Sequence, residues 1–90
     1  MYTLILSERA KEDIAKIKRS DPSSFKKISK LLIELAQHPR KGTGQVETLK
    51  HFNEETYSRR INQKHRLIYR VYDDIVEVLV LSAYGHYNDK

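Results

Sequence analysis

The residues of this chain best suited to acid–base chemistry lie in its second half. Glu47 supplies a carboxylate, and His86 and Tyr87 supply an imidazole and a phenol near the end. Basic residues stand between them, among them Lys50, Arg59, Arg60 and Arg66. A base, an acid and cations that hold developing negative charge are what metal-free cleavage of RNA requires. These residues lie in strand-like sequence rather than in a polar tail, but spacing alone does not show that they converge.

Size and composition limit what can hold such residues together. Ninety residues predict one domain, residues 1–90, with a single modest core. A content of 39% hydrophobic and 32% charged residues is typical of a soluble globular protein. The absence of cysteine excludes disulfides and thiolate metal sites. Residues 1–7 lack a basic segment, and the apolar run 75–81 is far shorter than the ~20 residues of a membrane span. We therefore expect a cytoplasmic protein.

The net charge of +5 favours a polyanionic partner such as nucleic acid. An acidic protein partner would explain the same excess of positive charge. Composition leaves these two alternatives open.

The first half of the chain predicts a strand and two helices. A β-prone run, residues 2–6, ends at Ser7, a good helix N-cap. Ala10, Ile14 and Ile17 then repeat at helical spacing. Asp21 and Pro22 are suited to begin a second helix. Its apolar stripe comprises Phe25, Ile28, Leu31, Leu32 and Leu35, and His38-Pro39 ends it. Both stripes are expected to face the core, and the lysines between them to face solvent.

The second half predicts strands. Residues 40–45 are expected to form a flexible basic connector, followed by strand candidates at 46–50, 56–61, 65–72 and 75–82, with turns at 62–64 and 73–74. The first candidate is the weakest, and the last, the most apolar, is expected at the centre of the sheet. The order β-α-α-β-β-β-β predicts an α+β fold, in which an antiparallel-rich sheet carries two helices on one face. Alternation puts Tyr57, Arg59 and Ile61 on one face of their strand. The face without helices is where arginines can gather.

Several other chemistries are disfavoured by the sequence. The histidines, His38, His51, His65 and His86, show no metal-ligand spacing. The acidic pair Asp73-Asp74 is read as a turn. The glycines at 42 and 44 lack P-loop spacing, and no motif supports a serine nucleophile. No metal or other cofactor is expected.

Four strings carry a family resemblance. They are GTGQVETLKH at 42–51, YSRRI at 57–61, KHRLIY at 64–69 and GHY at 85–87. In this order and at these separations they resemble the YoeB/Txe branch of the RelE toxin superfamily, over essentially the whole chain. The resemblance implies a RelE-like microbial RNase fold. It also implies a ribosome-dependent mRNA endoribonuclease, the toxin of a bacterial type II toxin–antitoxin pair, which cuts mRNA in the ribosomal A site and stops translation.

Carried over position by position, the resemblance implies roles for individual residues. Glu47 would be the general base and His86 the general acid. Arg66 matches the phosphate-stabilising arginine, and Tyr87 the tyrosine that helps to position substrate. The basic residues expected to bind substrate are Lys50, Arg60 and Arg59. The products would be a 2′,3′-cyclic phosphate and a 5′-hydroxyl.

The chain departs from the family's pattern at two places. Val46 and Thr48 flank Glu47 where the family often has proline, so Glu47 would be held less rigidly. Three residues, 88–90, follow Tyr87 where many relatives end.

The resemblance also implies partners. These are the bacterial ribosome with its mRNA, and an acidic antitoxin segment that folds as it wraps the toxin. The antitoxin complex would bind operator DNA. No membrane partner is expected, and a homodimer is left open.

Two rival interpretations stay open. One is a toxin of the same fold that acts on DNA gyrase, like the ParE branch, which would not need the set Glu47, Arg66 and His86. The other is a basic binding module that cleaves nothing, in which Glu47→Gln would leave activity in cells unchanged.

Overall fold

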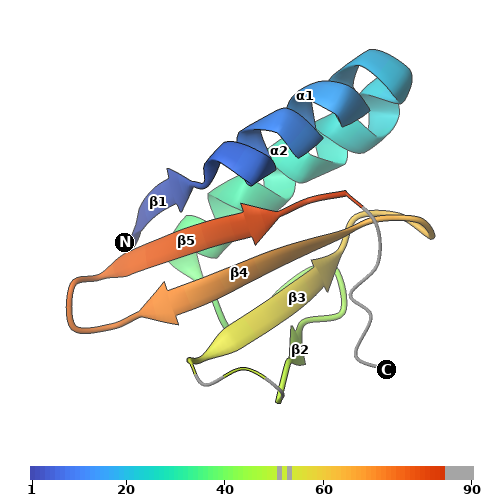
Figure 1. The fold of residues 1–90 in the computed structure, drawn as a ribbon. Helices are drawn as coiled ribbons and strands as arrows, with labels where there is room; N and C mark the ends of the chain where they lie inside the picture. The colour runs from blue at the N-terminus through green and yellow to red at the C-terminus, as the bar shows by residue number, and fades with distance from the viewer. Residues whose placement is uncertain (51, 53, 85–90) are drawn as a thin grey trace.

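A computed structural model describes residues 1–50, 52 and 54–84 of the chain; His51, His86 and Tyr87 lie outside these residues. Two helices cover one face of a five-stranded sheet (Figure 1). In chain order the elements are β1 (Thr3–Leu6), α1 (Glu8–Ser20), α2 (Pro22–Gln37), β2 (Glu47–Thr48), β3 (Thr56–Arg60), β4 (Arg66–Tyr72) and β5 (Glu77–Ser82). The predicted element order and the placement of both helices on one face are confirmed.

The strands lie in the order β1-β5-β4-β3-β2. β1 pairs with β5 in parallel, and the other neighbours are antiparallel, as an antiparallel-rich sheet requires. The expectation that the last strand lies at the centre is wrong. β4 is central because it forms hairpins with both β3 and β5, while β1 adds to the outer side of β5.

Two strands are shorter than predicted by more than one residue. β2 has only two residues, not the five of 46–50, and among the described residues it pairs only with β3, at the edge of the sheet. β5 begins at Glu77 rather than at residue 75, because residues 73–76 form the turn. Val76 has a φ of 54°, and its N–H donates to the Asp73 carbonyl at 3.2 Å. The turn therefore takes up two residues that look like strand in the sequence.

Both helices begin at the predicted caps. The Ser7 hydroxyl accepts from the Ala10 N–H at 3.0 Å and donates to the Leu81 carbonyl at 2.8 Å, so it also ties α1 to β5. The Asp21 carboxylate accepts from the Ser24 hydroxyl at 2.7 Å and from the Ser24 N–H at 3.3 Å. These bonds, the hydroxyl's first, lower the pKa of Asp21. A cap of this kind stabilises a helix by about 1 kcal/mol.

The core fills the space between the helices and the sheet. Apolar side chains of the two helical stripes, such as Ile17, Ile28 and Leu31, pack against Leu67 of β4 and Val78 of β5. All are at most 1% exposed, and burying an aliphatic side chain of this size contributes about 1.5–3 kcal/mol. The helix-facing side of the sheet is thereby closed to any ligand, and chemistry must use the other side.

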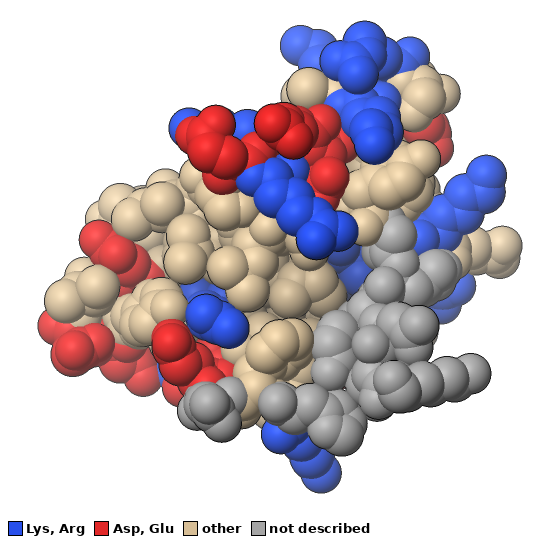
Figure 2. All heavy atoms as spheres, in the orientation of Figure 1, with Lys and Arg blue, Asp and Glu red and all other residues tan. Residues whose placement is uncertain are grey.

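Charge is distributed unevenly over the surface. Figure 2 shows acidic side chains gathered at the end of the molecule that holds the β4–β5 turn, and basic side chains at the far end of the helix pair. Exposed Lys18 and Arg19 lie in the last turn of α1 at that end. Within the described residues, neither helix combines the length and the apolar character that crossing a membrane requires.

Candidate active site on the open face of the sheet

Strand register brings the predicted basic residues together. Residues directly opposite each other in a pair of strands share a face of the sheet. Arg60 lies opposite Arg66, and Ser58 lies opposite both Glu47 and Ile68. Tyr57 and Tyr69 belong to the core, so these alternating neighbours point away from the helices. The expectation that arginines gather on the open face is confirmed for Arg60 and Arg66. Arg70, which the sequence analysis did not single out, lies on the same face.

Glu47 and Arg66 form an arginine–carboxylate pair on this face. The Arg66 Nη1 atom lies 3.6 Å from the Glu47 Oε1 atom and 3.4 Å from the Ser58 hydroxyl oxygen. The Arg66 side chain is 17% exposed, whereas that of Glu47 is 59% exposed. The guanidinium is thus held against the sheet, and the carboxylate beside it is open to solvent. A solvent-accessible carboxylate next to a fixed cation can take a proton close to a bound phosphate.

Arg70, four residues further along β4 and on the same face, repeats this arrangement. Its Nε donates to the Thr56 hydroxyl at 3.3 Å, and its Nη1 lies 3.8 Å from the Glu54 Oε2 atom. Its guanidinium also lies over the Phe52 ring, 5.8 Å from the centroid. The face therefore carries two arginine–carboxylate pairs of similar geometry, of which sequence reasoning singled out only the first.

The other predicted site residues occupy different positions. Arg60 is half-buried, and its Nε donates to the Asn62 carbonyl at 3.3 Å. Lys50 is exposed just after β2. His86 and Tyr87, predicted as the acid and the positioning tyrosine, lie outside the described residues, so their roles stay predictions.

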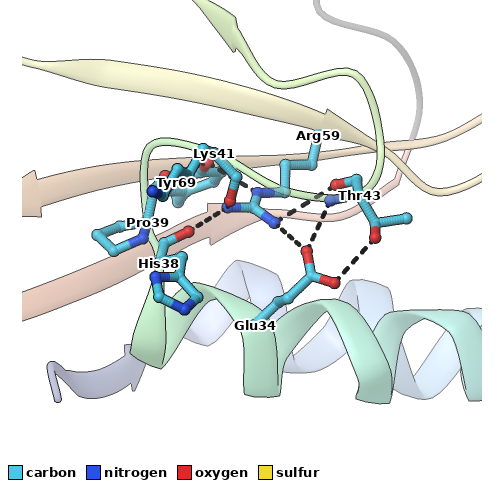
Figure 3. Close-up of polar contacts among 7 residues, drawn as sticks. All are labelled: Glu34, His38, Pro39, Lys41, Thr43, Arg59 and Tyr69. Carbon is cyan, nitrogen blue, oxygen red and sulfur yellow. Dashed lines mark hydrogen bonds and ion pairs between the residues drawn. The ribbon is translucent and has the colours of Figure 1, made fainter.

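Arg59 does not lie on this face. Its side chain is completely buried on the helix side of the sheet, together with its alternation partners Tyr57 and Ile61. Its Nη1 forms an ion pair with the Glu34 Oε1 atom at 2.6 Å, and its Nε donates to the Tyr69 hydroxyl at 3.1 Å. The prediction that Arg59 binds substrate is therefore corrected: its guanidinium is used within the protein (Figure 3).

The loop that connects α2 to β2 is held in place, contrary to the expected flexible connector. Arg59 Nη2 donates to the carbonyls of His38 and Lys41, and its Nη1 lies 3.4 Å from the Thr43 carbonyl. Glu34 accepts from the Thr43 N–H at 2.7 Å and from the Thr43 hydroxyl at 2.9 Å. The Thr43 N–H is the largest of the influences that lower the pKa of Glu34. We call Arg59, Glu34 and Thr43, with the carbonyls of His38 and Lys41, the loop clamp.

The same loop is also tied down from outside. Arg40 Nε donates to the Glu55 carboxylate at 2.5 Å, and Arg40 Nη2 to the Asp73 carboxylate at 2.7 Å. Asp73 accepts a second bond from the Tyr2 hydroxyl at 2.6 Å. The Arg40 bonds lower the pKa of Glu55, and those from Tyr2 and Arg40 lower the pKa of Asp73. Two arginines therefore hold the loop. Arg59 of β3 bonds the loop carbonyls, and Arg40, a residue of the loop itself, bonds the carboxylates of Glu55 and Asp73.

A buried carboxylate of α1 fixes the end of β5. Asp13 is 7% exposed, and it accepts from the backbone N–H groups of Ala83 at 3.0 Å and Tyr84 at 3.3 Å. The Tyr84 ring lies 4.3 Å from the His65 ring, and the Lys16 ammonium lies 4.4 Å from the Tyr84 centroid. These contacts set the point from which the chain continues toward residues 85–87.

Sequence reasoning missed both Asp13 and Glu34, although each left a signal. Asp13 interrupts the apolar stripe formed by Ala10, Ile14 and Ile17, and a carboxylate there must find buried donors. Glu34 lies next to Leu35, one turn before the helix end. Among the residues that the structure describes, no group of three or more His, Asp or Glu side chains is placed to hold a metal ion.

Comparison with known proteins connects this geometry to a family. Residues 6–87 match the family model described as YoeB-like toxin of bacterial type II toxin-antitoxin system. Toxin YoeB of Escherichia coli K12 is 37% identical over 84 residues, which cover 93% of this chain and 98% of that protein. A structure of the YoeB dimer from Staphylococcus aureus superposes with a TM-score of 0.81 at 35% identity, covering 96% of this chain and 98% of that one. A heterotetrameric YoeB–YefM toxin–antitoxin complex from the same species gives a TM-score of 0.79 at 34% identity, covering 97% and 99%.

Proposed function

This chain belongs to the YoeB-like toxins of bacterial type II toxin–antitoxin systems, and from that membership we propose that it is a ribosome-dependent mRNA endoribonuclease. The observation that carries the proposal is the solvent-exposed Glu47 carboxylate beside the fixed Arg66 guanidinium, on the face of the sheet that the helices leave open. It would act in the cytoplasm, where it would cut mRNA in the ribosomal A site and so inhibit translation.

The proposed reaction is a transfer of the phosphate within the RNA strand. Glu47 takes the proton of the 2′-hydroxyl, and the 2′-oxygen attacks the adjacent phosphorus. The bond from phosphorus to the 5′-oxygen breaks, and His86 gives a proton to that oxygen. The products are a 2′,3′-cyclic phosphate and a 5′-hydroxyl. Atoms and charge balance without a metal ion or another cofactor.

The cations of the open face supply the electrostatic part of the reaction. Arg66 is held by the Ser58 hydroxyl at 3.4 Å, which keeps its guanidinium where negative charge develops on the phosphate oxygens. Arg60 and Lys50 would bind neighbouring phosphates, and Tyr87 would position the substrate. Arg59 is left out of this set because it is buried in the loop clamp.

Partners follow from the family and from the charge of the chain. The YoeB–YefM complex from Staphylococcus aureus supports an antitoxin partner for this chain too. A net charge of +5 suits an acidic antitoxin segment that covers the open face. The pair would bind operator DNA through the antitoxin. The Staphylococcus aureus dimer supports a homodimer as the state of the free toxin.

The deciding experiment is primer extension on a defined mRNA, incubated with the purified protein in the presence and absence of programmed ribosomes. Wild type, Glu47→Gln and His86→Gln are compared with Glu54→Gln, whose carboxylate stands beside Arg70 in a similar pair. We expect cleavage at the A-site codon only with ribosomes, reduced about 10²- to 10⁴-fold in the first two variants. Glu54→Gln should cleave like wild type.

Two results would contradict the proposal. If folded, antitoxin-free protein leaves ribosome-bound mRNA intact, the gyrase-directed toxin or the non-cleaving binding module is favoured. If Glu47→Gln and Glu54→Gln lose activity equally, the loss reflects the charge of the open face and not a general base.

A further inference from the structure

Few contacts within the sheet fix the position of Glu47. β2 is an edge strand of two residues, and its pairs with β3 are Glu47 with Ser58 and Thr48 with Tyr57. Beyond it, the Leu49 N–H donates to the Thr56 carbonyl at 2.8 Å. A strand this short does not stabilise itself, so whatever fixes the chain before β2 also fixes the carboxylate.

The chain before β2 is the loop held by the loop clamp. Every N–H of the Arg59 guanidinium has a partner within the described residues: Nε bonds the Tyr69 hydroxyl, Nη1 bonds Glu34 and the Thr43 carbonyl, and Nη2 bonds two more loop carbonyls. Tyr69 in turn donates to the Pro39 carbonyl at 2.7 Å. A planar guanidinium with five donors in fixed directions can define loop geometry in a way that lysine cannot.

Two glycines let the backbone approach the clamp this closely. Gly42 has a φ of +128°, and a Cβ atom there would clash with the Glu34 Oε1 atom. The Gly44 carbonyl accepts from the Arg60 N–H at 2.5 Å, three residues before Glu47. Hydrogen bonds therefore run without a break from α2 through the loop to the strand that pairs with β2.

We propose that Arg59 and Glu34 are positioning residues for the cleavage reaction: by fixing the α2–β2 loop they hold the Glu47 carboxylate beside Arg66. The inference rests on the proposed function of Glu47 as general base. This positioning would matter in a chain where Val46 and Thr48, rather than proline, flank Glu47. A catalytic group displaced by about 1 Å can lose about 10²-fold in rate, so loosening the clamp should lower kcat.

The test compares Glu34→Ala with Glu34→Gln. Alanine removes the partner of a buried guanidinium and both bonds to Thr43, whereas glutamine keeps an oxygen acceptor and gains an N–H donor that can bond the Thr43 hydroxyl. We expect kcat to fall about 10- to 100-fold in Glu34→Ala, with KM within about threefold of wild type. Glu34→Gln should restore most of the rate. Thr43→Val, which removes only the hydroxyl bond, replaces Glu34→Ala if that variant does not fold.

Ser7→Ala is the matched control for stability. It removes a helix cap worth about 1 kcal/mol next to β1, at the opposite edge of the sheet from β2. Amide hydrogen exchange at Thr43 and Arg60 gives a readout that does not depend on cleavage. In the clamp variants, exchange at these two amides should accelerate more than exchange in the core strands. In Ser7→Ala, the exchange rates of these two amides and kcat should both stay near their wild-type values.

The outcomes separate the two proposals. Faster exchange at Thr43 and Arg60 with unchanged kcat overturns the positioning role and leaves the nuclease standing. An equal loss of kcat in Ser7→Ala overturns it too, because general destabilisation then explains the effect. If Glu47→Gln cleaves as fast as wild type, the proposed function fails and the positioning role fails with it.

Discussion

Replacing Arg66 by lysine should separate the chemistry of the open face from its stability. The change keeps the positive charge but removes the planar fork of donors that matches a phosphate. Arg70→Lys is the matched control, because Arg70 lies on the same strand as Arg66, bonds a hydroxyl in a similar way and has a carboxylate at a similar distance. Any difference between the two variants then reports on what Arg66 does to substrate.

The cost in stability is expected to be similar at the two positions. Arg66 lies 3.6 Å from a carboxylate that is 59% exposed, and Arg70 lies 3.8 Å from one that is 50% exposed. Ion pairs with a carboxylate this exposed contribute about 0–1 kcal/mol, and a long hydrogen bond to a hydroxyl contributes about 0.5–1.5 kcal/mol. Each substitution should therefore lower Tm by roughly 4–8 °C per kcal/mol lost, and the two shifts should agree within a few degrees.

The cost in rate is expected to differ. Removing one group that stabilises developing negative charge typically lowers kcat about 10²- to 10³-fold, or about 2.7–4 kcal/mol of transition-state stabilisation. Arg66→Lys should show such a loss, and Arg70→Lys should stay within about threefold of wild type.

Single-turnover cleavage of ribosome-bound mRNA, with thermal unfolding of the same samples, measures both quantities. Equal rate losses in Arg66→Lys and Arg70→Lys would refute the reasoning, since the face would then act only through its total charge. A normal rate in Arg66→Lys would refute it as well, because a point charge would then be sufficient.

Three further predictions concern the scaffold. Gly42→Ala should lower the free energy of unfolding by about 1 kcal/mol or more, measured by urea denaturation, because φ is +128° and the added methyl would meet the Glu34 carboxylate. Asp13→Ala should cost about 1–3 kcal/mol by the same measurement, because the N–H groups of Ala83 and Tyr84 lose their acceptor; Asp13→Asn, which keeps an oxygen, should cost less. The folded-state pKa of Glu34 is lowered, so its contribution is present at neutral pH, declines as pH falls below about 4.3 and is lost through the folded-state pKa. The Tm difference between wild type and Glu34→Gln should therefore shrink between pH 7 and pH 3, and a constant difference would contradict the ionic role.

Much of the fold could be predicted because local signals and tertiary packing agree. Ser7 and Asp21 cap helices in the sequence pattern and in the structure, and the apolar stripes that follow them face the core. The open face was predictable in the same way, because Arg60 and Arg66 occupy alternating positions opposite to the apolar ones.

The remaining differences come from contacts between distant parts of the chain. A glycine-containing basic loop is typical of a mobile connector, and the bonds that hold it here come from residues distant in sequence, such as Arg59, 16 residues after Thr43. The alternation already placed Arg59 with Tyr57 and Ile61 on the apolar face, so its burial was implicit in the pattern.

The parallel pairing of β1 with β5 has a consequence for when the protein can fold. Thr3–Leu6 pairs with Glu77–Val80, and Ser7 and Asp13 bond the backbone of residues 80–84. The first elements synthesised therefore cannot complete their contacts until the last ones have been made. Contacts so distant in sequence slow folding, because the chain loses conformational entropy before they form. The nascent chain lacks β5 until Glu77–Ser82 have been translated. The sheet is therefore completed only after both helices have been synthesised, which delays the appearance of a folded toxin.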